Sequence, residues 1–386
     1  KLMPIFLLIL ALWYLWSNYG YLLQSYRNAP RTTDPVSTSP LTLTPAPSTD
    51  PSLAHLNLPP GYTISYFARD VPGARSLARG SDGTIYVGTR PEGVVYALAD
   101  SDQNGVADTR YVVASGLNNP NGVAYEAGTL YVAEINRIIR FDNIDATYKN
   151  KPIPTVVYDQ LPKDTHHGWR YLAIGPDRRL YVGVGAPCNV CEVADPYGTI
   201  ASLNLDGTDF QIVARGIRNT VGFDWQPGSG MLWFTDNGRD LLGDDLPADE
   251  LNTIATENEH FGFPFCHATN FADPKFGKGK ICARFVWPVL ELSPHAAALG
   301  MKFVVDQIII AEHGSWNRST PIGYRLMQVD VRDNVASNYR VFVDGWLKSD
   351  GKVTGRPVDI LALPDGSLLV SDDFADAIYR IAYTGI

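Results

Sequence analysis

Charged residues are scarce in this chain of 386 residues. Only 19% of the residues are charged, the formal net charge is −9, and the 32 lysines and arginines form no basic run. Proteins that bind nucleic acid rely on clustered positive charge to contact phosphates. The composition therefore argues against nucleic acid as a partner.

Helical periodicity is also lacking. Beyond the first residues, no segment of any length repeats its apolar side chains at helical spacing. The chain instead contains 34 glycines and 27 prolines, as expected for many short strands joined by turns. Hydrophobic residues make up 45% of the chain, which is enough for a large core. These features predict an all-β fold.

Cysteine is rare, with four residues in the whole chain. Two local disulfides, Cys188 with Cys191 and Cys266 with Cys282, are the economical interpretation for a domain outside the cytoplasm. A zinc site is the alternative, although four-cysteine sites usually show two close pairs and only one pair is close here. Glu192 stands where covalent haem attachment needs a histidine, which excludes a c-type haem.

The first 23 residues are mostly apolar, and the run is roughly long enough to span a bilayer as a helix. A cleaved signal peptide is the alternative. Trp13, Trp16 and the tyrosines around them resemble interfacial aromatic residues, which favours an uncleaved membrane anchor at 1–23. Residues 24–60 are rich in Pro, Ser and Thr and predict an extended tether, part of which we expect to lie along another subunit.

One pattern recurs after Gly61: an apolar segment, a Gly/Asp turn and a strand of aromatic and β-branched residues. Six copies are found, at 77–88, 122–133, 165–185, 221–235, 301–311 and 359–370. Repeats of this length, each a small antiparallel sheet, predict a six-bladed β-propeller over 61–386.

In a propeller, the loops that enter the inner strands converge on one face around the central channel. This arrangement brings His166 and His167 near Asn121, Arg218-Asn219 and Arg356. Histidine titrates near neutral pH and is a natural proton acceptor at such a position. Arginine and asparagine beside it suit an anionic ligand that carries carbonyl groups.

Several longer motifs make the resemblance to a known family specific. They are HHGWRYLAIGPD (166–177), GAPCNVC (185–191), ARGIRNTVGFDWQPGSGMLWFTDNGRD (214–240), GDDLPADELN (243–252), FGFPFCH (261–267), AEHGSWNR (311–318) and GRPVDILALPDGSLLVSDDF (355–374). With these motifs the chain resembles the pyrroloquinoline quinone (PQQ)-dependent sugar dehydrogenases of the glucose/sorbosone type, and most closely the sorbosone and pyranose dehydrogenase branch. The family fold is a six-bladed propeller.

The resemblance implies a role for each matching residue. His167 matches the catalytic base that takes a proton from the sugar hydroxyl, and Arg218 matches an arginine that polarises the quinone oxygens. Asn219 matches a further cofactor contact, and Arg356 matches an arginine on a cofactor carboxylate. Asn121 is a candidate cofactor contact from its place in the funnel, beside Pro120, which stands about where the soluble glucose dehydrogenases have a glutamine near the cofactor. Backbone carbonyls of Gly238 and Arg239 are expected to hold calcium, and Glu250 either supports that calcium or caps a solvated loop. His295 and His313 are equally compatible with structural roles and with the substrate rim.

A separate signal lies between the first two repeats. Asp100, Asp102, Asn104 and Asp108 follow the first half of a calcium loop, with oxygen ligands at alternate positions and Gly105 for the turn. The closing glutamate of an EF-hand is missing, so we expect a structural calcium site closed by Asp108. An Asx-rich turn is the alternative.

The sequence therefore predicts a membrane-anchored sugar dehydrogenase on the periplasmic or extracellular side. PQQ and calcium are its expected cofactors, and a cytochrome or quinone is the expected electron acceptor. Two other functions remain open: a non-catalytic propeller subunit of a membrane assembly, and a calcium-dependent lactonase. A lactonase would need carboxylates clustered on a central metal.

Overall fold

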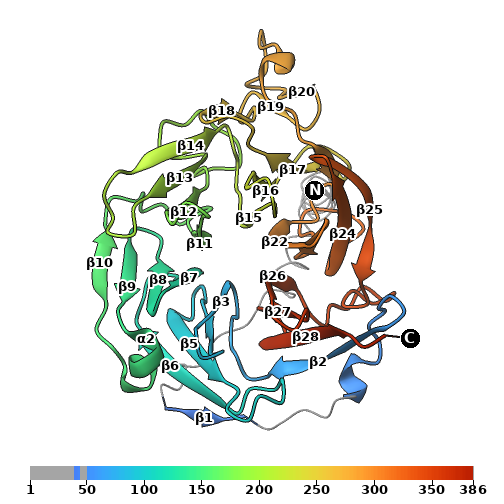
Figure 1. Ribbon diagram of the computed structural model, residues 1–386. Helices are drawn as coiled ribbons and strands as arrows, with labels where there is room; N and C mark the ends of the chain where they lie inside the picture. Colours follow the sequence, from blue (N-terminus) through green and yellow to red (C-terminus); the bar gives the residue numbers. More distant parts are fainter. Residues whose placement is uncertain (1–38, 44–49, 386) are drawn as a thin grey trace, which may run out of the picture.

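The computed structural model describes residues 39–43 and 50–385. Within them, six sheets of four or five strands, antiparallel except for one short parallel strand, stand around a central channel, as Figure 1 shows. The predicted six-bladed β-propeller is confirmed, and each predicted repeat supplies the inner hairpin of one blade.

The first three blades follow one another along the chain, and each runs from an inner to an outer strand. Blade 1 contains β3 (Leu77–Arg79), β4 (Ile85–Val87), β5 (Val94–Ala99) and β6 (Thr109–Ser115). Blade 2 contains β7 (Gly122–Glu126), β8 (Thr129–Ala133), β9 (Ile138–Phe141) and β10 (Thr155–Tyr158). Blade 3 contains β11 (Leu172–Ile174), β12 (Leu180–Val184), β13 (Thr199–Leu203), β14 (Gln211–Arg215) and the parallel β18 (Glu259–His260).

The remaining blades complete the ring, and the last one combines strands from both ends of the described chain. Blade 4 contains β15 (Phe223–Trp225), β16 (Leu232–Asp236), β17 (Asp249–Thr253) and β21 (Leu290–Leu292). Blade 5 contains β22 (Ala298–Val304), β23 (Gln307–Glu312), β24 (Arg325–Arg332) and β25 (Val335–Val343). Blade 6 contains β26 (Pro357–Ala362), β27 (Leu368–Asp372), β28 (Ala377–Tyr383) and β2 (Tyr62–Ala68).

Few other elements interrupt the described blades. They are the helices η1 (Pro51–Leu53), α2 (Ile144–Thr147), η2 (Tyr148–Asn150) and η3 (Cys282–Arg284), and the hairpin of β19 (Cys266–His267) with β20 (Phe271–Ala272). The hairpin belongs to an excursion that projects from the rim of the wheel (Figure 1). A disulfide between Cys266 and Cys282 closes it, and a second disulfide joins Cys188 to Cys191. Both predicted pairs are confirmed, and the zinc alternative is not realised.

The core lies between blades. Each of the six larger hydrophobic clusters combines side chains from two neighbouring sheets; Tyr86 and Val95 of blade 1, for example, cluster with Val132 and Ile139 of blade 2. A sheet that packs on both faces needs apolar residues on both, so β5 is a continuous apolar run with every residue buried. This packing holds the strand ends around the channel in fixed positions.

The described part of the predicted tether contacts the propeller. Leu41–Thr42 forms β1, which pairs with the outer strand β6 of blade 1, and Leu43 is buried beside it. Leu53 and Leu56 are also buried, and Asn57 forms a bridge to Asp344. These leucines give the segment apolar surface to bury on its own domain.

The predicted membrane anchor at 1–23 lies outside the described residues. Among residues 39–43 and 50–385, no helix is long and apolar enough to cross a bilayer.

Candidate active site

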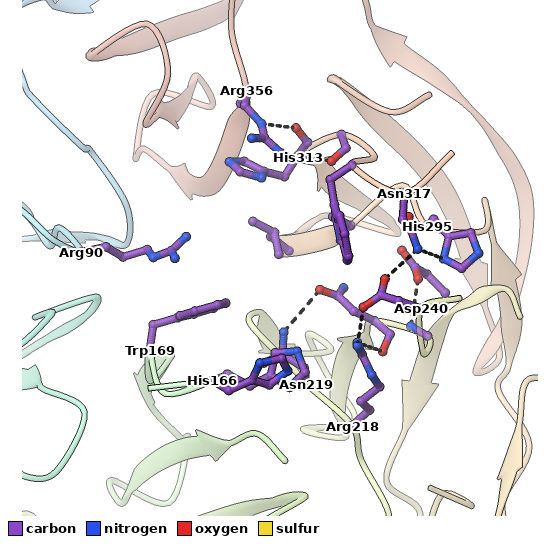
Figure 2. A pocket seen from close by; sticks show the side chains of 18 of the residues that line it. Arg90, His166, Trp169, Arg218, Asn219, Asp240, His295, His313, Asn317 and Arg356 are labelled. Atoms are coloured by element: carbon purple, nitrogen blue, oxygen red, sulfur yellow. Dashed lines mark hydrogen bonds and ion pairs between the residues drawn. The ribbon is translucent and has the colours of Figure 1, made fainter. Parts of the chain in front are cut away.

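A cavity of about 510 Å³ opens on the face of the propeller where the inner strands begin. Four arginines, four histidines and two tryptophans line it: Arg75, Arg90, Arg218, Arg356, His166, His167, His295, His313, Trp169 and Trp316. Figure 2 shows most of these side chains arranged around one space. They come from the loops that enter inner strands and from the loops between second and third strands, because both kinds of loop open on this face of an antiparallel blade.

His167 is buried at the entry to blade 3 and has a left-handed backbone with φ of 49°. Its Nδ1 lies 2.8 Å from the carbonyl oxygen of Ala186, so Nδ1 carries the proton that is donated to this carbonyl. Nε2 is then the ring nitrogen with a free lone pair. Gly185 makes the close approach possible, since a Cβ there would lie 2.6 Å from the His167 Cβ.

The His167 ring is neutral near pH 7. Burial lowers its pKa well below the usual 6.5, and the charge of Arg218 and the neighbouring His166 lower it further. The ring of His166 lies 4.1 Å away, and Trp169 packs edge-on at 6.2 Å. A neutral imidazole with a fixed tautomer can accept a proton at Nε2.

Arg218 is held by a network on the wall beside His167. Its Nε donates to the Asn189 carbonyl at 2.8 Å, and its Nη2 donates to Asn189 Oδ1 at 3.0 Å and to Asp240 Oδ2 at 2.8 Å. Asn189 lies inside the short loop closed by the Cys188–Cys191 disulfide. The disulfide therefore constrains the residue that orients Arg218.

Arg218 and Asn219 are also fixed through their backbone. Asp236 accepts both backbone N–H groups, at 2.8 Å and 2.7 Å. Burial raises the pKa of Asp236 to about 6, while these N–H groups act against the increase. As predicted, Arg218 and Asn219 line the same cavity as His167.

The opposite side of the cavity contains a buried charged network. Arg75 Nη1 donates to Asp373 at 2.9 Å, and the other oxygen of Asp373 lies 2.8 Å from His313 Nε2. Burial alone would raise the pKa of Asp373, but His313 and Arg75 hold it well below its ordinary value. Arg356 lines the cavity as predicted, and it donates to the neutral backbone carbonyls of His313 and Gly314 at 3.1 Å each.

Asn121 does not line the cavity, in contrast to its predicted role as a cofactor contact. Its Oδ1 accepts from Arg75 Nε at 2.9 Å and its Nδ2 donates to the Arg170 carbonyl at 2.9 Å. Both polar atoms of the Asn121 amide are therefore hydrogen-bonded to other residues of the cavity wall. Asn121 therefore orients Arg75, and Arg75 is the residue that reaches the cavity.

Arg90 and Trp169 form one wall. The Arg90 guanidinium lies 3.9 Å from the centre of the Trp169 ring, and its Nε has no hydrogen-bond partner among the described residues. Burial and repulsion by Arg75 lower the pKa of Arg90 to about 10, so it remains charged at neutral pH. A charged guanidinium in the lining of the cavity suits an anionic ligand group.

The predicted metal ligands are only partly brought together. Gly238 lines the cavity, and its N–H donates to Asp249 Oδ1 at 2.9 Å; burial raises the pKa of Asp249 to about 7. The side chain of Arg239 turns to Asp273 at 2.6 Å. Glu250 is absent from the cavity lining and accepts from Asn252 and the Ala268 N–H. Successive strand residues face opposite sides, so Asp249 reaches the cavity and Glu250 does not.

The Asp100–Asp108 loop lies on the opposite face, between β5 and β6. Carboxylate oxygens of Asp100, Asp102 and Asp108 lie within 4.8 Å of one another. Asp100 also accepts the N–H groups of Asn104 and Gly105. The predicted grouping of acidic residues is present, and it is separate from the active-site cavity.

Comparison with known proteins places this geometry in a family. The TrAA12-like family model matches residues 56–383. The chain belongs to the TrAA12-like family. This membership agrees with the resemblance found in the motifs, and the match covers nearly all of the described propeller.

Two relatives and three solved structures illustrate the likeness of this TrAA12-like chain. An uncharacterized protein of Borreliella burgdorferi is 34% identical over 86% of this chain and 92% of the relative. A PQQ-dependent sugar dehydrogenase of Hypocrea jecorina is 22% identical over 66% of this chain and 67% of the relative.

The solved structures share the fold at low sequence identity. The iodide structure of the Trichoderma reesei family AA12 enzyme has a TM-score of 0.76 at 22% identity, covering 85% of this chain and 97% of the other. The PQQ domain of Coprinopsis cinerea pyranose dehydrogenase gives 0.73 at 18%, covering 84% and 96%. The aldose sugar dehydrogenase of Streptomyces coelicolor gives 0.63 at 18%, covering 84% and 99%.

Proposed function

We propose that this protein is a sugar dehydrogenase that uses PQQ and calcium, with His167 as the catalytic base. The observation that carries the proposal is the buried neutral His167, whose Nδ1 is bonded to Ala186, in a cavity lined by four guanidinium groups. A binding module has no need for a base of fixed tautomer beside such a cluster. The family and the related PQQ-dependent enzymes support the same function.

The described residues fit PQQ. Its several carboxylates need cationic partners, and both Arg90 and Arg356 line the cavity. The hydrogen bonds of the Arg356 side chain go to the neutral carbonyls of His313 and Gly314. Its flat ring system needs a flat apolar surface, which Trp169 provides at the cavity wall (Figure 2). When bound, PQQ supplies the carbonyl group that receives a hydride from the sugar carbon.

The chain's own residues prepare the substrate side of the reaction. His167 Nε2 takes the proton of the sugar hydroxyl, while the bond from Nδ1 to Ala186 keeps the ring in place. Arg218, fixed by Asn189 and Asp240, holds a positive charge beside the base. That charge favours the neutral form of His167 before the reaction and stabilises negative charge in the cavity during it.

Calcium fits best beside Gly238. Hard cations prefer oxygen ligands, and the proposed ligands are the backbone carbonyls of Gly238 and Arg239. Asp249, whose Oδ1 accepts from the Gly238 N–H, offers a carboxyl oxygen at this point of the cavity wall. Glu250 is directed elsewhere and is not part of the proposed site. The Asp100, Asp102 and Asp108 cluster is proposed as a second, structural calcium site.

Two disulfides support a location on the periplasmic or extracellular side. The apolar residues 1–23 are proposed to anchor the protein in a membrane, and a cytochrome or quinone is the proposed electron acceptor. The cavity supports neither of the alternative functions, a non-catalytic propeller subunit or a calcium-dependent lactonase. Its described lining contains only two carboxylates, Asp240 and Asp249, and both are engaged by wall residues.

Reconstitution tests the proposal. The purified protein is loaded with PQQ and calcium, and the quinone absorbance is recorded as aldoses and aldose-derived ketoaldehydes are added with an artificial electron acceptor. Reduction by at least one sugar, with turnover, is the expected result. No spectral change with any sugar, or hydrolysis of lactones by the protein with calcium alone, would overturn it.

A further inference from the structure

A projecting part of the rim carries positive charge on an otherwise acidic protein (Figure 1). The excursion and its return to blade 4, residues 266–288, contain four lysines and arginines and one aspartate. The rest of the chain contains 28 lysines and arginines and 40 aspartates and glutamates. The four cationic side chains, Lys275, Lys278, Lys280 and Arg284, are all exposed. They are called the basic surface below.

The acidic residue of the excursion does not neutralise the basic surface. Asp273 is buried, and its Oδ2 accepts from Arg239 Nη1 at 2.6 Å and lies 3.1 Å from His267 Nε2. The ion pairs found among the described residues include none of the four cations of the basic surface. Their charge therefore faces the solvent.

Two large apolar side chains are exposed beside these cations. Ile281 is 56% exposed and Trp287 is 43% exposed. The Trp287 indole N–H donates to the Cys282 carbonyl at 3.2 Å, and this bond holds the ring against the turn that begins after Ile281 and contains Arg284. Tryptophan and arginine are enriched at the energetic centres of protein interfaces. The composition of the basic surface and its surroundings is thus that of a protein-binding surface.

The excursion is fixed to the wall of the cavity. Arg239 follows the cavity residue Gly238 and turns outward to Asp273. Asp273 Oδ1 accepts the backbone N–H groups of Lys275 and Phe276 at 2.8 Å each, so it begins the turn that presents the lysines. One ion pair therefore joins the cavity wall to the basic surface.

Charge and position together indicate the kind of partner. Oxidation of one sugar hydroxyl to a carbonyl releases two electrons and two protons, so the proposed function needs an electron acceptor that comes close to the cavity. Proteins that meet for electron transfer bury small surfaces, and complementary charge orients their encounter. A lipid surface fits less well, because binding to a bilayer increases with buried apolar area and this part of the structure offers only Ile281 and Trp287.

We propose that the basic surface is the docking site of an acidic protein that carries one electron at a time, such as a haem protein with clustered carboxylates. This inference rests on the proposed function, because it assigns the place where the electrons leave. Two encounters remove the two electrons of one oxidised sugar, and the two protons pass to water. Positive charge confined to one part of an acidic molecule orients each encounter beside the cavity wall.

The test uses one acceptor protein in two charge states. The loaded holoprotein, with its best sugar, reduces either lysine-rich mitochondrial cytochrome c or the same cytochrome after succinylation of its lysines. Lys278→Glu/Lys280→Glu, the excursion variant, reverses two charges of the basic surface. Lys149→Glu/Lys151→Glu is the matched control, because these exposed lysines have the same spacing and lie at η2 of blade 2. The small neutral acceptor para-benzoquinone measures the activity that does not depend on docking.

For wild type, kcat/KM should be higher for the succinylated cytochrome than for the lysine-rich one and should fall as salt is added. The excursion variant should lower this kcat/KM by about tenfold or more, the lower end of the effect of electrostatic steering on association, and should reduce para-benzoquinone at the wild-type rate. The control should keep the wild-type values. Equal losses in the two variants, equal losses with both kinds of acceptor, or no loss in the excursion variant would show that the inference is wrong.

Binding measurements separate this inference from the proposed function. If no sugar reduces the loaded wild-type protein, the proposed function fails, and calorimetric titration of the unloaded protein with succinylated cytochrome tests docking alone. Weaker binding by the excursion variant than by wild type would support the site, whereas equal binding, or no binding by either, would overturn it. Sedimentation with phosphatidylserine vesicles tests the lipid alternative. Vesicle binding that falls in the excursion variant, with cytochrome reduction unchanged, would also overturn the inference.

Discussion

The Nδ1 atom of His167 lies 2.8 Å from the carbonyl oxygen of Ala186, across the entry to blade 3. This single bond decides which ring nitrogen is free to accept a proton. It also ties the base to the strand end that precedes the Cys188–Cys191 loop. The base and the loop that orients Arg218 are thus parts of one rigid corner of the cavity.

Replacement of His167 tests the base directly. His167→Ala should bind PQQ with unchanged affinity, while kcat falls by about two to four powers of ten, the usual contribution of a general base. His166→Ala is the matched control, because it removes the neighbouring imidazole and should lower kcat far less. Equal losses in the two variants would contradict the assignment.

The pH dependence of kcat/KM should reflect the lowered pKa of His167. The base works in its neutral form, so activity is lost as pH falls through the folded-state pKa. Burial and Arg218 place that pKa well below 6.5, and the acid limb of the profile should lie well below pH 6.5 as well.

Arg218→Gln should move this acid limb to higher pH. Removing the cation removes part of the penalty on protonating His167, so its pKa rises and activity is lost at a higher pH. Arg340→Gln is the control. Arg340 lies on β25, the outer strand of blade 5, where it pairs with Asp330 of β24. An acid limb that stays in place in Arg218→Gln would show that Arg218 does not influence the base.

The two disulfides should differ in what their removal costs. Cys188→Ala/Cys191→Ala frees Asn189, which makes two hydrogen bonds to Arg218, so kcat/KM should fall by about tenfold or more. Cys266→Ala/Cys282→Ala opens the excursion between residues 266 and 282, none of which lines the cavity, and should reduce the free energy of unfolding by about 3 kcal/mol. Thermal or urea unfolding with parallel kinetics measures both. Equal losses of kcat/KM and of unfolding free energy in the two double variants would contradict this prediction.

Calcium should stabilise the propeller through the loop between β5 and β6. At a calcium concentration of about 100 times Kd, binding to the native state adds about 2.7 kcal/mol. Part of the calcium-dependent rise in Tm of the unloaded protein should therefore disappear in Asp102→Ala. Asp142→Ala, at an exposed aspartate of blade 2, should retain the full rise. If Asp102→Ala keeps the full calcium-dependent rise in Tm, the loop does not bind calcium and is an Asx-rich turn.

The sequence was sufficient to predict the fold and half of the cavity. Turn and strand signals recur in every blade, so the six repeats could be counted, and the residues before inner strands could be placed on one face. His167, Arg218, Asn219 and Arg356 reach the cavity from such positions. Asn121 occupies the same kind of position, but its short side chain is bonded to Arg75 and the Arg170 carbonyl.

The other half of the cavity comes from the loops between the second and third strands of the blades. In a four-stranded antiparallel blade, the loop between the second and third strands returns to the same face as the entry loop. Arg90, Asp240 and Asn317 lie in these loops. Because the order of the strands in a blade places these loops on the cavity face, Arg90, Asp240 and Asn317 could have been predicted from it. The contacts of Asn317 with Asp240 and His295 could not be predicted, because they join three separate loops.

The pairing of β2 with β28 sets an order for synthesis. Tyr62 lies opposite Tyr383, so blade 6 lacks one strand until residues 377–383 have been made. The closing contact is therefore among the most distant in sequence, and contacts of this kind form slowly. Until then the edges of β2 and β27 remain open to other chains. A stop codon at position 377 should consequently give a product that aggregates, even though the described cavity residues, the last of which is Arg356, have already been translated.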